Sequence, residues 1–292
     1  MEEYFHKPVF GEIILDYLDI KPSDKVLDCT CGEGGHSSII LERIKGNGFL
    51  VGLDRDGEIL SVAEKRLKEI GEDFLLLNIP FSSAKEALKA LNIKGFDKAL
   101  VDLGLSMYHI INEDRGFSFF SDERCDMRYN RTGKEQPASY ILNNYSEKEI
   151  SDIIFSYGEE RMARKIAHAI VSERRKKPIE TCKELAQIVA RVYKVRGKIN
   201  PATKTFQALR IYVNSELSEL NEFFLILPEI INKNGRVGII SYHSLEDRLV
   251  KNFFRNSEHF EPLNKKVITP DESEIAFNKA ARSAKLRVGL RL

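Results

Sequence analysis

Short apolar runs alternate with helical apolar spacing along the first third of the chain. Four runs have the length and composition of buried strands, namely residues 26–28, 50–53, 74–77 and 98–102. Between the first two, isoleucine and leucine recur over 39–44 at the spacing of one helix face. Because strands that alternate with helices build a parallel sheet, this pattern predicts an α/β domain.

A glycine-rich turn separates the first predicted strand from the first helix. It reads Gly32-Glu33-Gly34-Gly35, and Asp54 follows the second predicted strand. Glycines let a ligand approach the backbone closely, and an acid at this spacing can accept hydrogen bonds from ribose hydroxyls. The pattern indicates a nucleotide site, with an ordinary βαβ unit as the alternative.

The turn departs from the dinucleotide pattern G-x-G-x-x-G at its third glycine. Gly35 is followed by His36, Ser37 and Ser38. A site that holds no pyrophosphate, such as one for S-adenosylmethionine, tolerates this absence. The turn therefore favours a methyltransferase, while an NAD-dependent oxidoreductase stays open.

Roughly 130 residues separate the fourth predicted strand from the next convincing one, 236–241. A usual crossover takes about 30 residues, so we expect an inserted domain. Three stretches of the gap have helical apolar spacing, 147–157, 159–174 and 182–193, and the polar stretch 122–137 is interpreted as a loop. We predict a main domain in two parts, 1–107 and 206–292, around a helical domain of residues 108–205.

A long helix is expected over 206–224, where the chain returns to the main domain. Its apolar positions recur at steps of three or four and mark a buried face: Phe206, Leu209, Val213, Leu217, Leu220 and Phe224. A neighbouring face carries Gln207, Arg210 and Asn214. Amide and guanidinium groups suit directed hydrogen bonds, so this stripe is either a binding surface or an ordinary polar face.

Bulk properties describe a globular protein with one large domain or two modest ones. The chain has 292 residues, of which 42% are hydrophobic and 30% charged. We find no apolar run of about 18 residues and no basic-then-apolar leader, so we expect a cytoplasmic location. The cysteines lack paired C-x-x-C spacing, and we predict no metal site: Cys29, Cys31, Cys125 and Cys182.

The net charge of +1 conceals a basic segment between Arg161 and Lys198. Twelve Lys or Arg and three Glu lie there, including the run 174–177. The C-terminal stretch adds cations without acids: Lys279, Arg282, Lys285, Arg287 and Arg291. Each cluster by itself is often a solvated face, but together, beside a nucleotide-type site, they favour a phosphate-rich partner.

Asp102 opens the motif DLGLS at the end of the fourth predicted strand. Asp28 and Asp54 also stand at strand ends, so the three acids should converge on one crevice. Further motifs follow in order: RGFSF from Arg115, DMR from Asp126, YGEER from Tyr157, FQALRI from Phe206, SYHSLEDR from Ser241 and SAKLR from Ser283. With HKPV from His6, this set closely resembles the bacterial ribosomal RNA small subunit methyltransferase H family, also called MraW.

The resemblance covers nearly the whole chain and implies a class I S-adenosylmethionine-dependent methyltransferase fold, a Rossmann-like α/β sheet with an inserted all-helical domain that recognises substrate. Members of that family methylate N4 of one cytidine in the decoding region of 16S ribosomal RNA, with S-adenosylmethionine as cofactor. The implied partner is therefore 16S rRNA in the small ribosomal subunit. A second copy of the chain is a further candidate partner.

The cofactor contacts of the family fall on seven positions of this sequence: Gly34, Gly35, His36, Asp54, Phe81, Asp102 and His109. Phe81 matches an aromatic position near the adenine. His109 stands where the family usually has glutamine, in DLGLSMYH instead of DLGVSSPQ. A neutral imidazole lacks the paired donor and acceptor of an amide, so this contact would differ in kind.

Asp102 is also the candidate catalytic group. A cytosine amine is a poor nucleophile because its lone pair is delocalised into the ring, so an acceptor near its N–H would assist attack. The Asp102 carboxylate or a carbonyl of residues 103–105 suits this task, and a pure cofactor contact is the alternative role of Asp102.

The target base must leave its stack, and single-stranded RNA is held by stacking and phosphate contacts. Candidate stacking residues, each with a core role as the alternative, are Tyr108, Phe117 and Phe119. Candidate RNA-binding residues are Arg115, Arg128, Arg210 and His243. Ser244 and Asp247 fit a helix-capping box, so part of that motif is expected to be structural. A non-catalytic RNA-binding factor is the third function class that the basic helices allow.

Overall fold

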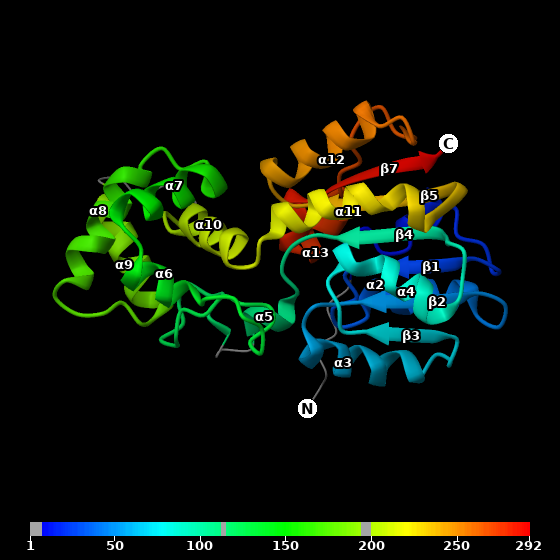
Figure 1. Ribbon diagram of the computed structural model, residues 1–292, viewed down its shortest axis with the longest axis horizontal. Coiled ribbons are helices and arrows are strands. Elements are labelled where there is room, and N and C mark those ends of the chain that lie inside the picture. Colours follow the sequence, from blue (N-terminus) through cyan, green and yellow to red (C-terminus); the bar gives the residue numbers. More distant parts are fainter. Residues whose placement is uncertain (1–7, 112–114, 194–199) are drawn as a thin grey trace. The chain divides into compact units, whose positions relative to one another are not determined.

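The computed structural model describes residues 8–111, 115–193 and 200–292 (Figure 1). His6 and Lys7 of the HKPV motif lie outside these residues, as does the end of the basic segment. The chain forms two compact units. The sheet unit comprises residues 1–104 and 217–292, and the helical unit comprises residues 105–216.

The sheet unit is built on seven strands in the order β3-β2-β1-β4-β5-β7-β6. Their bounds are β1 Lys25–Asp28, β2 Phe49–Leu53, β3 Phe74–Leu77, β4 Phe96–Asp102, β5 Ile231–Ser241, β6 Phe260–Pro262 and β7 Lys285–Arg291. Strands β1 to β5 pair in parallel, and β7 runs antiparallel to both β5 and β6. This arrangement confirms the predicted class I methyltransferase sheet.

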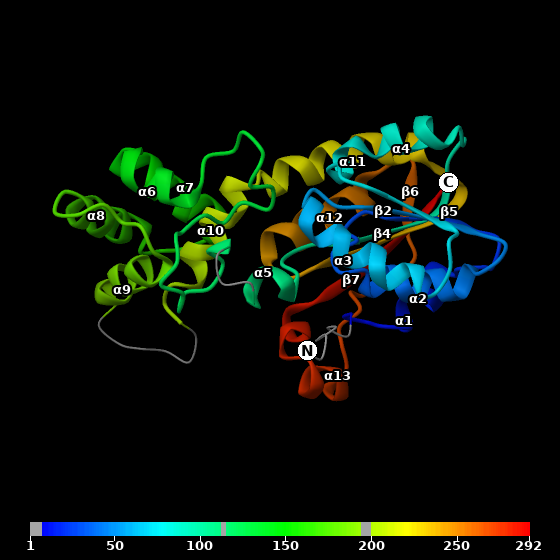
Figure 2. The same ribbon diagram turned by 90° about the horizontal axis from the view of Figure 1, so that it is seen from below.

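Helices cover both faces of the sheet because the strand side chains alternate between two apolar cores. One face, with Val26 and Leu50, packs against α1 (Ile13–Leu18) and α2 (Gly35–Ile44). The other face, with Leu27 and Val51, packs against α4 (Ala84–Leu91), α11 (Glu216–Ile230) and α12 (Ser244–Asn256). Figure 2 shows these two helical layers, with α3 (Gly57–Lys68) in the first.

The helical unit has its own apolar core. Its helices are α5 Met107–Ile111, α6 Ala138–Asn144, α7 Glu147–Gly158, α8 Ala163–Arg174, α9 Cys182–Val192 and α10 Thr203–Val213. Capping boxes start two of them, from Ser146 to Glu149 and from Thr181 to Glu184. The three predicted helices are present, although the second begins at Ala163 instead of residue 159.

The helix predicted over 206–224 is wrong as a single element. Helix α10 ends at Val213 and α11 begins at Glu216, with Ser215 between them in the left-handed region at φ 51°. The apolar spacing continues across this break, so periodicity gave no sign of it. Phe206 packs in the core of the helical unit and Phe224 in that of the sheet unit. The chain therefore rejoins the sheet unit after residue 216, beyond the predicted boundary at 205/206.

The C-terminal basic stretch forms a strand that the sequence analysis did not predict. It contributes β7, and α13 (Glu272–Phe277) and the 3-10 turn η3 (Lys279–Ser283) precede it. Residues 122–137 contain no helix or strand, in agreement with the predicted loop. Among the described helices, none combines the length and the apolar character that crossing a bilayer requires.

Candidate active site

One turn after β1 links the three strand-end acids. The amide of Thr30 donates to Asp28 Oδ1 at 3.2 Å, and the Thr30 hydroxyl accepts from the Asp102 amide at 2.7 Å. Two residues further, the Gly32 amide donates to Asp54 Oδ2 at 2.9 Å. The acids at the carboxyl ends of β1, β2 and β4 therefore meet at one edge of the sheet, as their positions predicted.

Backbone geometry explains the glycines of this turn. Gly32 and Gly34 have φ values of 54° and 79°, which favour glycine. A Cβ on Gly34 would also lie 3.3 Å from the Ala63 Cβ of α3. Gly35 then begins α2, whose first amides have no acceptor inside the helix. The glycines thus let the turn pass close to α3 and lead into α2 beside the Asp54 carboxylate.

Asp102 is held by neutral or weakly basic groups. The Tyr242 hydroxyl donates to Asp102 Oδ1 at 2.8 Å, and His36 Nδ1 lies 3.5 Å from Oδ2. The Asp102 side chain is 23% exposed. Burial raises the pKa of Asp102 to about 6, although His36 and the Tyr242 hydrogen bond act in the opposite direction. This carboxylate can therefore gain and lose a proton near neutral pH.

The imidazole of His36 faces inward. Its ring is buried, with Nε2 2.8 Å from the Val9 carbonyl oxygen and Nδ1 toward Asp102. A contact between His36 and a cofactor would therefore come from its backbone at the start of α2. The predicted position lies in the site, but its side chain supports Asp102.

Asp28 lies at the bottom of the same site. It is fully buried, and the Ser37 hydroxyl donates to its Oδ2 at 2.6 Å. Burial raises its pKa, which the charge of His36 partly opposes. Cys29 and Cys31 are buried nearby, and burial raises the pKa of both thiols. The predicted packing role of these cysteines agrees with their burial.

Phe81 follows β3, in the 3-10 turn η1 (Phe81–Ser83). Its ring packs edge-on against Phe223 of α11, with the centroids 5.2 Å apart. Glu219 of α11 is buried and pairs with Arg55 at 3.2 Å. Burial raises the pKa of Glu219, and the charge of Arg55 and the backbone of Ser82 and Phe81 oppose that rise. The sequence analysis did not predict a role for Glu219 near the Phe81 turn, because the two residues are far apart in the chain.

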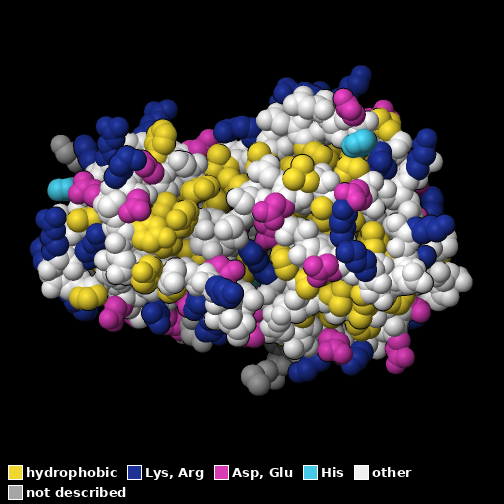
Figure 3. All heavy atoms as spheres, in the orientation of Figure 1, with side chains coloured by type: hydrophobic (Ala, Val, Ile, Leu, Met, Phe, Trp, Pro, Cys, Tyr) yellow, Lys and Arg dark blue, Asp and Glu magenta, His cyan; other side chains and the backbone are white. Residues whose placement is uncertain are grey.

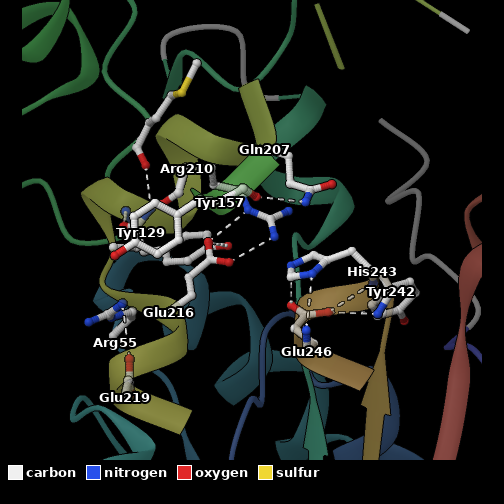
Figure 4. A network of polar contacts seen from close by, with 12 residues as sticks. Arg55, Tyr129, Tyr157, Gln207, Arg210, Glu216, Glu219, Tyr242, His243 and Glu246 are labelled. Atoms are coloured by element: carbon white, nitrogen blue, oxygen red, sulfur yellow. Dashed lines mark hydrogen bonds and ion pairs between the residues drawn. The ribbon is translucent and has the colours of Figure 1, made fainter. Parts of the chain in front are cut away.

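The predicted RNA-binding arginines are bonded within the helical unit. Arg128 pairs with both carboxylate oxygens of Asp126 at 2.7 and 2.9 Å, and Arg210 pairs in the same way with Glu216 at 2.8 and 2.9 Å. The Tyr129 hydroxyl also donates to Glu216, as Figure 4 shows. Arg115 is buried and donates to the Tyr129 carbonyl.

The stripe on α10 makes directed hydrogen bonds, but to its own chain. Asn214 Oδ1 accepts from the Tyr129 amide at 2.8 Å, and its Nδ2 donates to the Met127 carbonyl at 2.7 Å. Gln207 donates to the Tyr157 carbonyl at 3.2 Å. Asn214 therefore fastens the irregular segment after Asp126 to the end of α10, and Gln207 ties α10 to α7.

His243 caps α12. Its Nδ1 accepts from the Glu246 amide, and the Glu246 carboxylate accepts hydrogen bonds from the Tyr242 and His243 amides (Figure 4). The predicted capping box at Ser244 and Asp247 is therefore wrong by one residue. Asp247 instead accepts from Lys285 and Arg287 of β7, at 3.1 and 2.8 Å. Lys285 and Arg287 of the basic tail therefore have a structural role, because they pair β7 with α12.

His109 belongs to α5 of the helical unit. Its ring is buried, with centroids 5.4 Å from Phe117 and 5.2 Å from Tyr129. Phe117 is buried in the same core, and Phe119 packs edge-on against Phe206 at 5.1 Å. These contacts favour the core role that was the alternative for Phe117 and Phe119.

Exposed cations gather on α8 and α9, where Figure 3 shows Lys and Arg interspersed with acids. Several pair with a neighbour, including Lys176 with Glu173 and Lys183 with Asp122. Other exposed cations of this region are Arg161, Arg164, Lys165 and Arg175. They give the helical unit a surface that suits phosphate groups.

The family model described as the MraW methylase family matches residues 3–291. The chain belongs to this family. That membership confirms the family predicted from the ordered motifs.

Curated relatives agree with the assignment to the MraW family. "Ribosomal RNA small subunit methyltransferase H" of Dictyoglomus turgidum is 45% identical over 291 residues, which cover 99% of this chain and 98% of the relative. The proteins of the same name from a Sulfurihydrogenibium species and from Thermotoga neapolitana are each 44% identical. Their alignments cover 98% and 97% of this chain, and 99% and 95% of the relatives.

Proposed function

We propose that this MraW-family protein transfers a methyl group from S-adenosylmethionine to N4 of a cytidine in the decoding region of 16S ribosomal RNA. The match of the family model to residues 3–291 carries this proposal. The name of the curated relatives supports the ribosomal substrate, and a substrate of that kind implies a cytoplasmic location.

The residues at the sheet edge fit the proposed cofactor. Gly34 and Gly35 present close backbone, Asp54 is half-buried and can accept hydrogen bonds from ribose hydroxyls, and the half-buried ring of Phe81 can lie against an adenine. A set of carboxylates suits a ligand that carries hydroxyl, ammonium and sulfonium groups. Such a cofactor supplies an electrophilic methyl group on a positively charged sulfur.

The protein contributes positioning and a proton acceptor. In-line attack requires the cytosine nitrogen about 3 Å from the methyl carbon, so orientation supplies much of the rate. As the new nitrogen–carbon bond forms and the carbon–sulfur bond breaks, the amine becomes acidic. Asp102 Oδ2 then accepts the amine proton, and water later removes it. Because Asp102 ionises near neutral pH, it suits this step.

The helical unit is proposed to hold the RNA. Its exposed cations, such as Arg161, Arg164 and Lys165, would contact phosphates. We assign Arg128 and Arg210 an indirect part, since each already has a bidentate acid partner and shapes the segment around Tyr129. His243 would likewise act through the start of α12.

The test is methylation of small ribosomal subunits, and of naked 16S rRNA, from cells that lack this modification. The purified protein is mixed with radiolabelled S-adenosylmethionine, and modified nucleotides are mapped by mass spectrometry. We expect one N4-methylated cytidine in the decoding region. RNA binding without methyl transfer would support a non-catalytic RNA-binding factor, and binding of NAD in place of the methyl donor would support an oxidoreductase.

A further inference from the structure

The hydrogen bond from His36 to the chain start fixes where the imidazole carries its hydrogen. Nε2 lies 2.8 Å from the Val9 carbonyl oxygen. A carbonyl oxygen only accepts, so Nε2 must donate and therefore bears the hydrogen. In the neutral ring, Nδ1 is then a bare acceptor.

That bare nitrogen faces another acceptor. Nδ1 of His36 lies 3.5 Å from Asp102 Oδ2. When His36 is neutral and Asp102 is ionised, a lone pair faces a carboxylate oxygen with no hydrogen between them. One added proton turns this contact into a hydrogen bond, either as an imidazolium facing a carboxylate or as a carboxylic acid donating to Nδ1.

Tyr242 sets which oxygen of Asp102 faces His36. Its hydroxyl donates to Oδ1 at 2.8 Å, and burial, with the nearby Asp102 charge, raises the pKa of Tyr242 well above its ordinary value. The tyrosine therefore stays a donor. Its ring also lies against Gly104, where an added Cβ would be only 3.2 Å from Cδ2. With Oδ1 fixed in this way, Oδ2 is the oxygen that exchanges a proton.

We propose that His36 and Asp102 act as one proton acceptor, and that Tyr242 is the positioning residue that orients the pair. This inference rests on the proposed function and deepens it. During transfer, the nitrogen–carbon bond forms, the carbon–sulfur bond breaks, and the amine proton passes to Asp102 Oδ2. His36 Nδ1 shares that proton until water takes it up, so the pair ends each turnover in its starting charge.

The surrounding charges strengthen the proton affinity of the pair. Asp28 below β1 and Glu246 of α12 both raise the pKa of Asp102, and Glu274 of α13 acts on Tyr242 in the same sense. Asp102 itself titrates near pH 6. Three carboxylates and one phenol therefore surround the pair: Asp28, Glu246, Glu274 and Tyr242.

The first test needs neither cofactor nor RNA. The protein is labelled with 15N-histidine, and the ring nitrogens of its six histidines are followed by NMR from pH 5 to 9. The signal of His36 is assigned as the one that His36→Asn removes. We expect the neutral ring to carry its hydrogen on Nε2, and the Nδ1 resonance of His36 to move in Asp102→Asn, where a carboxamide replaces the facing carboxylate. An Nδ1–H form, or an unchanged Nδ1 resonance in the variant, would overturn the proposal.

The second test compares single-turnover methyl transfer in His36→Asn, Tyr242→Phe and the control His259→Asn. His259 is exposed in the sheet unit, and its hydrogen bonds with Ser257 and Arg291 are made by its backbone, so loss of the ring should leave the rate unchanged. We expect His36→Asn to slow transfer about 10- to 100-fold, and Tyr242→Phe to move the midpoint of the pH–rate profile, with binding of donor and RNA within about threefold of wild type. Wild-type rates and profiles in both variants would contradict the shared acceptor.

The two tests separate this inference from the proposed function. If the wild-type protein methylates no RNA, the proposed function fails while the NMR spectra still report the His36–Asp102 contact. If methylation occurs but the Nδ1 resonance of His36 is the same in wild type and Asp102→Asn, the shared acceptor fails and the proposed function stands.

Discussion

Carboxylates in the two units of this protein are held in opposite ways. In the helical unit, Asp126 and Glu216 each receive two hydrogen bonds from one arginine. At the sheet edge, Asp28 bonds to a serine hydroxyl and Asp102 to a tyrosine hydroxyl beside an imidazole. Burial raises the pKa of both sheet-edge acids, whereas Asp126 raises the pKa of its partner Arg128.

The difference shows how the same residue type serves structure in one place and chemistry in another. A carboxylate clamped by a guanidinium stays ionised and fixes geometry, because the pair is planar and doubly bonded. A carboxylate buried among hydroxyls and an imidazole retains affinity for a proton. The first kind fastens the segment around Tyr129, and the second is available to a substrate.

The largest effect is expected from Asp102→Asn, which removes the proton-accepting carboxylate at the sheet edge. Asparagine keeps the acceptor for Tyr242 but cannot take up a proton. We expect methyl transfer to fall about 10²- to 10⁴-fold, as for loss of a general base. Single-turnover rates measure the effect, and equilibrium dialysis with the methyl donor separates it from weakened binding. A wild-type rate would remove any chemical role for Asp102.

The matching change in the helical unit is Arg210→Met. It leaves Glu216 half-buried with only part of its bonding, so we expect a loss of about 3 kcal/mol in the free energy of unfolding. Denaturant unfolding measures it, and the double variant with Glu216→Leu should recover most of the loss. If Arg210 instead served RNA directly, stability would hold while RNA affinity fell.

Asp102→Asn should also stabilise the protein, in a pH-dependent way. The folded-state pKa of about 6 lies above the ordinary 3.8, so the contribution of Asp102 to stability is complete below about pH 4 and is lost as pH rises through 6. Asparagine avoids that loss. We expect about 1–3 kcal/mol of extra stability at pH 8, fading toward pH 4. Thermal unfolding at both pH values checks this, and a destabilised variant at pH 8 would contradict it.

The smallest expected effect belongs to Arg128→Lys. Lysine keeps the charge but cannot bond both oxygens of Asp126, so we expect a loss of about 1 kcal/mol in the free energy of unfolding. The control is Lys148→Ala, which removes an exposed pair with Asp152 on α7 and should leave stability unchanged. Equal effects of the two variants would mean that the Arg128 clamp adds nothing beyond a surface pair.

Several parts of the fold and site could be predicted because their signal is local. The strand-end positions of Asp28, Asp54 and Asp102 followed from short apolar runs, and parallel strands bring such ends to one edge. The long gap after the fourth strand indicated an insertion for the same reason. The contact between His36 and Asp102 was not predictable in this way, since it joins α2 to β4.

Other features were missed because their cause is not periodic. The break at Ser215 interrupts an apolar pattern that continues on both sides of it, and only the two separate cores reveal it. Strand β7 was interpreted as part of a basic tail, since its cations gave no sign of the pairing with Asp247. Arg128 and Arg210 were predicted to bind RNA from their residue type alone. Residue type does not reveal that Arg128 pairs with Asp126, two residues away, or that Arg210 pairs with Glu216, six residues away.

The sequence by itself determined the family, the five parallel strands of the sheet and the three acids, because motif order and apolar spacing are properties of the chain. Tertiary structure alone decided which groups surround each acid. Tyr242 reaches Asp102 because β5 pairs with β4 in a register that sets Ile240 beside Asp102. Proton affinity depends on burial and on neighbours within a few ångströms, and folding brings Tyr242 to Asp102 from 140 positions away in the chain.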